Sequence, residues 1–254
     1  MSLQPMQDGR QTLVAEAFDR QGNTSMDIIN VVVDTTAPVP RTASGSLVRG
    51  VVSGTGVAVF LYYRAEETRP DHYNLWQTVD GGVPAKVDTT KGGWDLVRLR
   101  PGHLYGHRTK AFDRAGNSAW SEESHRRIRL SPETALSISG KWRRLVDEDA
   151  LGDHVLRSSD PGARASFNLQ ADQVGLVVTT GPAAGKIRAW VAGWDPAIID
   201  LYSRHPLRRR IFPVPYLDRS PLVHIEVLGS KNPLSTGHRV DIDGIVSLAE
   251  RLPS

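Results

Sequence analysis

The sequence predicts an all-β protein, and three observations carry this prediction. Glycine and proline supply 23 and 16 of the 254 residues, which is typical of many short strands joined by turns. Apolar residues recur at every second position in segments such as VAVFLYY (57–63), the period of a half-buried strand. The string AFDRxGN occurs at residues 17–23 and again at 111–117, 94 positions further on. This spacing equals the length of one small β-sandwich.

The repeated string has the chemistry of a hairpin turn. Asp19 and Asp113 can accept N–H bonds from the turn backbone, and Gly22 and Gly116 can take positive φ. The flanking segments 10–19 and 26–34 predict two strands, with TTAP (35–38) leading into a linker. Two strands alone are marginal in water. We therefore expect the hairpin to cover its apolar face on the next domain or on another copy of the chain.

Residues 1–38 thus resemble the C-terminal hairpin of a bacterial immunoglobulin-like module whose other strands are missing. We expect the chain to be a piece of a longer protein. Residues 39–130 predict a complete sandwich, with strands in VAVFLYY (57–63), HYNLWQTVDGG (72–82) and WDLVRLRPGHLYGHRTKAFD (94–113). Tyr105 stands where a tyrosine corner would bond its hydroxyl to backbone between Leu99 and Gly102.

The motifs VDGG, LRPGHLY and HRTKAFDRAGNSAW make residues 39–130 resemble bacterial fibronectin type III modules, which are immunoglobulin-like sandwiches. One departure is Tyr63, where such modules usually have a core tryptophan. Eight segments of residues 131–254 predict the strands of a C-terminal β jelly roll: 141–146, 163–169, 174–180, 187–193, 197–203, 208–214, 222–229 and 239–248.

Residues 138–249 resemble carbohydrate-binding modules of secreted enzymes, of the galactose-binding-like superfold. SGKWRRL, DPGARASFNL, TTGPAAGKIRAWVAG, IIDLY and VLGSKNPLSTGHRVDIDGIVSL carry the resemblance. Where that family tends to have a Val-Asp-Gly turn, this chain has Val191-Ala192-Gly193. The resemblance implies a secreted or cell-surface bacterial protein that binds polysaccharide or a surface glycan.

Composition narrows the function classes. The net charge is +3, and the basic clusters HRRIR (125–129) and RHPLRRR (204–210) are typical of solvated strand edges, so we expect no nucleic-acid partner. No apolar run reaches the length of a membrane span. There is no cysteine and no GxSxG, HExxH or Walker motif. The sequence therefore predicts that this region is not an enzyme, although a longer parent protein would have room for a catalytic domain elsewhere.

Acidic residues gather in the loop DEDALGD and near the C-terminus. Oxygen ligands of this kind suit calcium, so the candidate ligands of a structural calcium are Asp147, Asp149, Asp153, Asp241 and Asp243. The alternatives are turn capping with surface solvation, and glycoside hydrolysis by a carboxylate pair. No other cofactor is expected.

Strand alternation predicts the glycan site. If Ile187 and Ala189 point inward, Trp190 points outward, and the same argument places Tyr202 outside. The predicted ligand-binding residues are Trp190, Trp194, Tyr202, Lys231 and Asn232. The alternative is that these rings fill the core or a domain seam, as we expect for Trp76, Trp94, Trp120 and Trp142. The leading function is a non-catalytic accessory region that binds glycan beside neighbouring domains of a longer chain. The alternatives are a structural or adhesive spacer and an unrecognised glycan-acting hydrolase.

Overall fold

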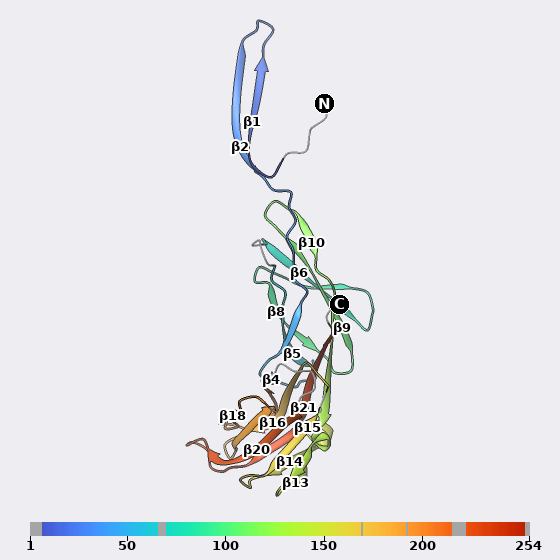
Figure 1. Ribbon diagram of the computed structural model, residues 1–254, viewed down its shortest axis with the longest axis vertical. Helices are drawn as coiled ribbons and strands as arrows, with labels where there is room; N and C mark the ends of the chain where they lie inside the picture. Colours follow the sequence, from blue (N-terminus) through green and yellow to red (C-terminus); the bar gives the residue numbers. More distant parts are fainter. Residues whose placement is uncertain (1–6, 66–69, 169, 192, 215–221, 252–254) are drawn as a thin grey trace.

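The fold is all-β, as the sequence predicts, and is described here from a computed structural model. The structure describes residues 7–65, 70–168, 170–191, 193–214 and 222–251. Figure 1 shows an elongated molecule in which a hairpin, a first sandwich and a second sandwich follow one another. Within the described ranges, no helix has the length and apolar character needed to cross a bilayer.

The first AFDRxGN string forms the turn of the N-terminal hairpin. Its two strands pair antiparallel along their whole length: β1 (Gly9–Phe18) and β2 (Thr24–Val33). Asp19 closes the turn, because its Oδ1 accepts the backbone N–H groups of Gln21 at 2.8 Å and Asn23 at 2.9 Å. Gly22 takes a φ of +85°, which glycine adopts without steric cost. The predicted turn chemistry is confirmed.

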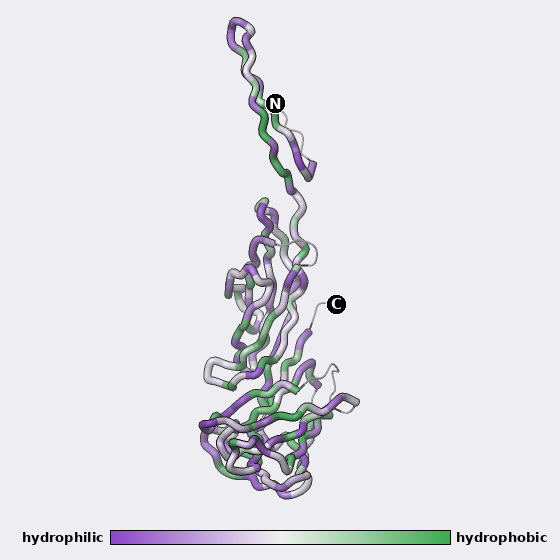
Figure 2. Tube along the Cα trace, turned by 90° about the vertical axis from the view of Figure 1, so that its left-hand side faces the viewer, coloured by the Kyte–Doolittle hydropathy of each residue, from purple (hydrophilic) through white to green (hydrophobic). Residues whose placement is uncertain are grey.

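The prediction that this hairpin docks on the next domain is wrong. The strands point away from both sandwiches, and Figure 2 shows apolar stretches along them. Phe18 and Val32 are 68% and 75% exposed. The chain leaves the hairpin through an extended segment, where Asp8 accepts bonds from the hydroxyls of Thr35 and Thr36. This base ties the hairpin to its own linker instead of folding it back onto the sandwich.

The first sandwich packs a small sheet against part of a large one. The small sheet has the order β3 (Ser44–Leu47), β5 (Val57–Tyr62), β8 (Trp94–Leu99). The facing strands are β7 (Ala85–Thr90), β6 (His72–Val79), β9 (Leu104–Phe112) and β11 (Ser124–Pro132), with β10 (Ser118–Trp120) paired to β9. Tyr63 is fully buried edge-on to Tyr73, so it fills part of the core of the first sandwich. The Tyr105 hydroxyl accepts the Arg100 N–H at 2.8 Å, which confirms the predicted tyrosine corner.

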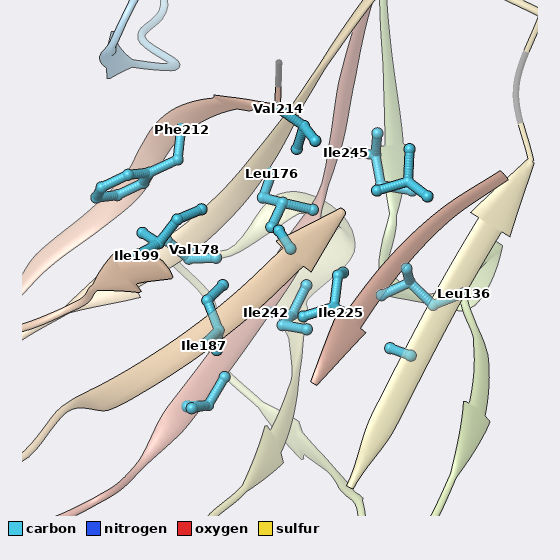
Figure 3. Close-up of a cluster of buried hydrophobic side chains, with 14 of the residues drawn as sticks. Leu136, Leu176, Val178, Ile187, Ile199, Phe212, Val214, Ile225, Ile242 and Ile245 are labelled. Carbon is cyan, nitrogen blue, oxygen red and sulfur yellow. The ribbon is translucent and has the colours of Figure 1, made fainter. Parts of the chain in front are cut away.

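The second sandwich encloses the core drawn in Figure 3. One sheet has the order β12 (Ser137–Ser139), β15 (Arg164–Asn168), β20 (Leu222–Lys231), β17 (Gly185–Val191), β18 (Ala197–Asp200). The facing strands are β4 (Gly50–Val51), β19 (Leu207–Val214), β16 (Gln173–Thr180), β21 (Val240–Arg251), β14 (His154–Ser158) and β13 (Arg143–Val146). Leu176 and Ile242 meet Ile187 and Ile225 between the two sheets (Figure 3). Each of the eight segments predicted as strands contains a strand, whereas β12 and β14 were not predicted.

One 11-stranded sheet runs through both sandwiches. β11 pairs with β9 at its start and with β21 along its length. The position between residues 130 and 131, where the sequence analysis ends one domain and begins the next, therefore lies inside a strand. Arg126 of β11 is fully buried, and its guanidinium bonds to the Ala43 carbonyl and to the Glu250 carboxylate. Gln173 also ties β3 to the second sandwich, by accepting the Leu47 N–H at 2.7 Å. The two sandwiches therefore share hydrogen bonds and core residues.

Candidate functional site

The outer face of the β12-β15-β20-β17-β18 sheet gathers most of the predicted ligand-binding residues. Along β17, Ile187, Ala189 and Val191 are buried, so the residues between them face outward. The same alternation on β20 buries Val223, Ile225 and Val227. The predicted orientation of β17 is confirmed.

Trp190 lies on this face beside His224 of β20. The two residues are direct partners in the ladder, and their rings stack with centroids 5.1 Å apart and planes 22° apart. Both side chains are half-buried. A stacked neighbour holds the indole in one orientation and reduces the entropy lost when a ligand packs against it.

Charged side chains surround this aromatic pair. Arg164 of β15 lies 3.3 Å from the Glu226 carboxylate of β20. Arg188 of β17 is exposed, and the ladder places it between Glu226 and Ile198. The Ile198 side chain is 65% exposed. The face therefore offers an aromatic ring, an apolar side chain and both signs of charge.

A second polar group lies at the other end of β17, around Asp200. Its Oδ2 accepts the Asn232 side-chain amide at 2.8 Å, and its Oδ1 accepts the Tyr202 N–H at 2.9 Å. The Lys186 Nζ lies 4.0 Å from the same carboxylate. Lys231 is the ladder partner of Gly185, at this same end. Tyr202, Lys231 and Asn232 are thus brought together, as their joint prediction requires.

Trp190 is not part of that second group. It lies four residues along β17 from Lys186, which is about 13 Å in an extended strand. Trp194, 42% exposed, follows in a turn closed by its N–H bond to the Val191 carbonyl. The five predicted residues therefore form two groups, one at each end of β17. Such an arrangement suits an extended chain of sugars better than a single ring.

The ligand-binding residues named from the sequence leave out several side chains of this face: Lys186, Arg188, Asp200, His224 and Glu226. Their outward position follows from the period-2 pattern of β17, β18 and β20, so the signal was present. The predicted burial of other tryptophans is partly wrong. Trp94 and Trp120 are 51% and 41% exposed, because they lie on outward positions of β8 and β10. Trp142 does pack against the second core.

Three of the five candidate calcium ligands are paired with arginines rather than with one another. Arg157 binds both oxygens of Asp241 at 2.6 and 2.9 Å, and Arg208 lies 3.1 Å from Asp147 and 3.0 Å from Asp149. Asp153 belongs to the short 3-10 helix η2 (Leu151–Asp153). In the part of the chain that the structure describes, no three acidic or histidine side chains are arranged to hold a metal ion. Calcium binding stays a prediction of the sequence.

Asp243 is the most perturbed carboxyl group among these ligands. It is fully buried and accepts the Leu151 N–H at 2.5 Å, while its Oδ2 has no partner among the described residues. Burial raises the pKa of Asp243 to about 6, and the nearby Asp147 and Glu133 charges add to the rise. Glu133, in the 3-10 helix η1 (Glu133–Ala135), is 3% exposed. The carboxyl groups of Asp243 and Glu133 are both shielded from solvent. A substrate would reach them only if the segments that cover them moved.

No known protein family matches the chain, and no curated protein matches it. Solved structures with a similar fold include a family two carbohydrate esterase from Cellvibrio japonicus, 14% identical over 52% of this chain and 36% of that chain (TM-score 0.35). A Paenibacillus xanthan lyase is 13% identical over 78% of this chain and 19% of that chain (TM-score 0.36). An exo-β-1,3-galactanase from Phanerochaete chrysosporium is 10% identical over 94% of this chain and 68% of that chain (TM-score 0.34). The chain spans only a minor part of the esterase and the lyase.

These comparisons correct one prediction. The sequence predicts that this region is not an enzyme, whereas the similar structures are an esterase, a lyase and a galactanase. The prediction of a non-catalytic region is therefore not retained. At TM-scores of this size the likeness is loose, and it transfers no residue role to this chain.

Proposed function

We propose that the second sandwich of an extracellular bacterial protein binds a glycan through the outer face of its β12-β15-β20-β17-β18 sheet. The ligand is an oligosaccharide segment of a polysaccharide or cell-surface glycan, lying along β17 from Trp190 toward Asn232. Its sugar rings pack their C–H faces on the indole, and their hydroxyls bond to the amide and charged side chains of the face.

The observation that carries this proposal is the Trp190 ring, which stacks on His224 at a half-buried position of a sheet face that also carries charged side chains. A large apolar ring that stays only partly buried forgoes part of the burial free energy available to it, which favours a ligand or partner that covers it. The Asp200–Asn232 bond adds a fixed polar group at the far end of the strand. Fixed polar groups around an apolar ring are typical of small-molecule and sugar sites.

A glycan-array screen of the whole chain tests the proposal. We expect binding to a defined set of oligosaccharides, with dissociation constants between about millimolar and micromolar. Trp190→Ala should remove the signal, and Asn232→Ala should weaken it. The same saccharides are then incubated with the chain and checked for cleavage or deacylation, so that binding and turnover are both measured.

Trp94→Ala provides the matched control, because Trp94 is also an exposed tryptophan but lies on the first sandwich. It should leave array binding by the second sandwich unchanged. An array without any hit, or hits on neutral saccharides that survive Trp190→Ala and Asn232→Ala together, would contradict the proposal. That outcome would favour a structural or adhesive spacer instead.

A further inference from the structure

The first sandwich carries a second pair of aromatic rings, the half-buried Trp76 and the exposed Trp120, on the outer face of β6, β9 and β10. Trp76 of β6 is the ladder partner of Arg108, and Trp120 of β10 is the partner of Lys110. The two indoles meet edge to face, with centroids 5.9 Å apart. Because these positions alternate with the buried Leu75 and Thr109, all four side chains lie on the outer face.

These rings line a pocket of about 380 Å³. Its other walls include Thr78 and Glu123, whose side chains are bonded at 2.9 Å. Both sit over Gly106, where an added Cβ would come within 1.9 Å of the Glu123 carboxylate. The glycine therefore leaves space for the carboxylate on the sheet surface. A volume of this size is at the lower end of the range of small-ligand sites.

Two cations lie beside the Trp120 ring: Arg108, which lines the pocket, and Lys110, which stands outside its lining. The Arg108 guanidinium lies 4.7 Å from the centre of the Trp120 ring, and the Lys110 ammonium lies 5.7 Å from it. The Arg108 Nε donates to the Ser121 carbonyl at 2.9 Å, which fixes the side chain. Neither cation forms an ion pair with a carboxylate in the described ranges. The pocket thus combines aromatic surface with the Arg108 cation and the Glu123 carboxylate in its walls, and Lys110 adds a second cation beside Trp120.

We propose that this pocket binds an acidic saccharide. The sugar ring packs against the Trp76–Trp120 pair, and its carboxylate or sulfate pairs with Arg108 and Lys110. The Glu123 carboxylate accepts a sugar hydroxyl. The Trp76 Nε1 is buried without a partner among the described residues, so an acceptor that enters between the indoles satisfies it.

A saccharide fits this pocket better than an acidic peptide for two reasons. The walls offer hydrogen-bond acceptors as well as donors, which match hydroxyl groups, and the flat indole surfaces match a sugar ring. An acidic peptide would use the cations and leave the aromatic surface and Glu123 without a role. The inference rests on the proposed function only for the class of ligand, since it involves different residues on a different sandwich.

Isothermal titration of the whole chain tests this inference with four probes. Oligogalacturonate supplies carboxylates, a carrageenan oligosaccharide supplies sulfates, a neutral galactose oligosaccharide lacks charge, and polyglutamate is an acidic peptide. We expect at least one charged oligosaccharide to bind, more weakly at high salt, and the neutral one to bind this pocket less tightly. Trp120→Ala and Arg108→Gln should each lower that affinity about tenfold or more.

Trp94→Ala is the control variant and should leave the affinity unchanged. The melting midpoint of each variant identifies any loss of folding, and the exposed Arg108→Gln keeps the test valid if Trp120→Ala unfolds. Unchanged affinity in Arg108→Gln, or polyglutamate binding as tight as that of the oligosaccharides, would overturn the inference. If Trp190→Ala alone abolishes binding, the inference is wrong while the proposed function stands. If Trp120→Ala alone abolishes binding, the inference stands and the proposed function is wrong.

Discussion

The tryptophans of this protein differ in structural role, and the difference follows from the residues around each of them. The Trp142 indole donates to the carbonyls of Ser139 and Arg164 at 3.2 and 3.0 Å and packs against the second core, so it is a structural residue. Trp190 stands on a polar sheet face beside an imidazole. Both occur in strand-like sequence, but only the outward parity of Trp190 makes it available to a ligand.

At the same scale, Asp243 should make stability depend on pH. Its folded-state pKa of about 6 lies above the ordinary aspartate value of 3.8, so folding favours the protonated carboxyl group. The stabilisation is fully present below about pH 4 and is lost as pH rises through 6. Asp243→Asn is neutral throughout and should not show this loss. Relative to its value at pH 4, the unfolding free energy of the wild type should fall below that of the variant by about 2–3 kcal/mol at pH 7.

Denaturant unfolding of both proteins between pH 4 and 7 measures this difference. Subtracting the two curves removes the contributions of the other titrating groups, which both proteins share. Parallel pH profiles for the wild type and Asp243→Asn would show that the carboxyl group is not desolvated in the folded chain.

Among the elements, the N-terminal hairpin contributes little to the stability of the sandwiches. Its side-chain bond to the first sandwich is made by the Asn117 amide, which donates to the Asp34 carbonyl at 2.8 Å. Its apolar side chains bury no surface on either core. Deleting residues 1–36 should therefore lower the melting midpoint of the sandwiches by less than about 2 °C. Differential scanning calorimetry of the full and shortened chains checks this, and a fall comparable to the loss of a core strand would disprove it.

Most of the strands were predictable from the sequence, but the exposure of the N-terminal hairpin was not. Alternation identified β16, β17, β20 and β21 because each buries one or both faces over many residues. The strand β12 has only three residues, too few for a period to show, whereas length does not explain the missed β14, because the predicted β13 and β18 are shorter. The apolar hairpin residues predicted burial, but sequence carries no information on whether a neighbour lies within reach.

The candidate site was predictable in parts. Local parity correctly placed Trp190 outward, and Asn232 and Tyr202, which were named together, both bond to Asp200. Their separation along β17 depends on the pairing of β17 with β18 and β20, which no local pattern encodes. The pocket around Trp120 depends on the pairing of β9 with both β6 and β10, and was missed for the same reason.

Across the whole molecule, β11 makes the two sandwiches one mechanical unit. Arg126 is fully buried, and burial lowers its pKa while the Glu250 carboxylate opposes that shift. Its Nη1 lies 3.1 Å from the His107 Nδ1, and burial, followed by the Arg126 charge, lowers the pKa of His107 to about 3. His107 is therefore neutral at physiological pH and can accept a bond from the guanidinium.

Glu250→Ala should lower the free energy of unfolding of both sandwiches together. It leaves the Arg126 charge buried without its carboxylate, a change that costs about 3–5 kcal/mol. Because β11 belongs to both sandwiches, calorimetry should show one unfolding transition, moved to lower temperature in the variant. The exposed Glu148→Ala serves as the control and should leave the transition in place. Two separate transitions, of which only one moves, would contradict the shared unit.

Glycan binding by the second sandwich through Trp190 is tested most directly by the indole N–H signals of the six tryptophans. A ¹H–¹⁵N NMR titration of the ¹⁵N-labelled chain is carried out with the strongest saccharide from the glycan array, and each signal is assigned by single tryptophan substitutions. We expect a saturable shift of the Trp190 signal. The Trp142 signal belongs to a structural indole and should stay in place. Saturable binding of the saccharide without any shift of the Trp190 signal would contradict it.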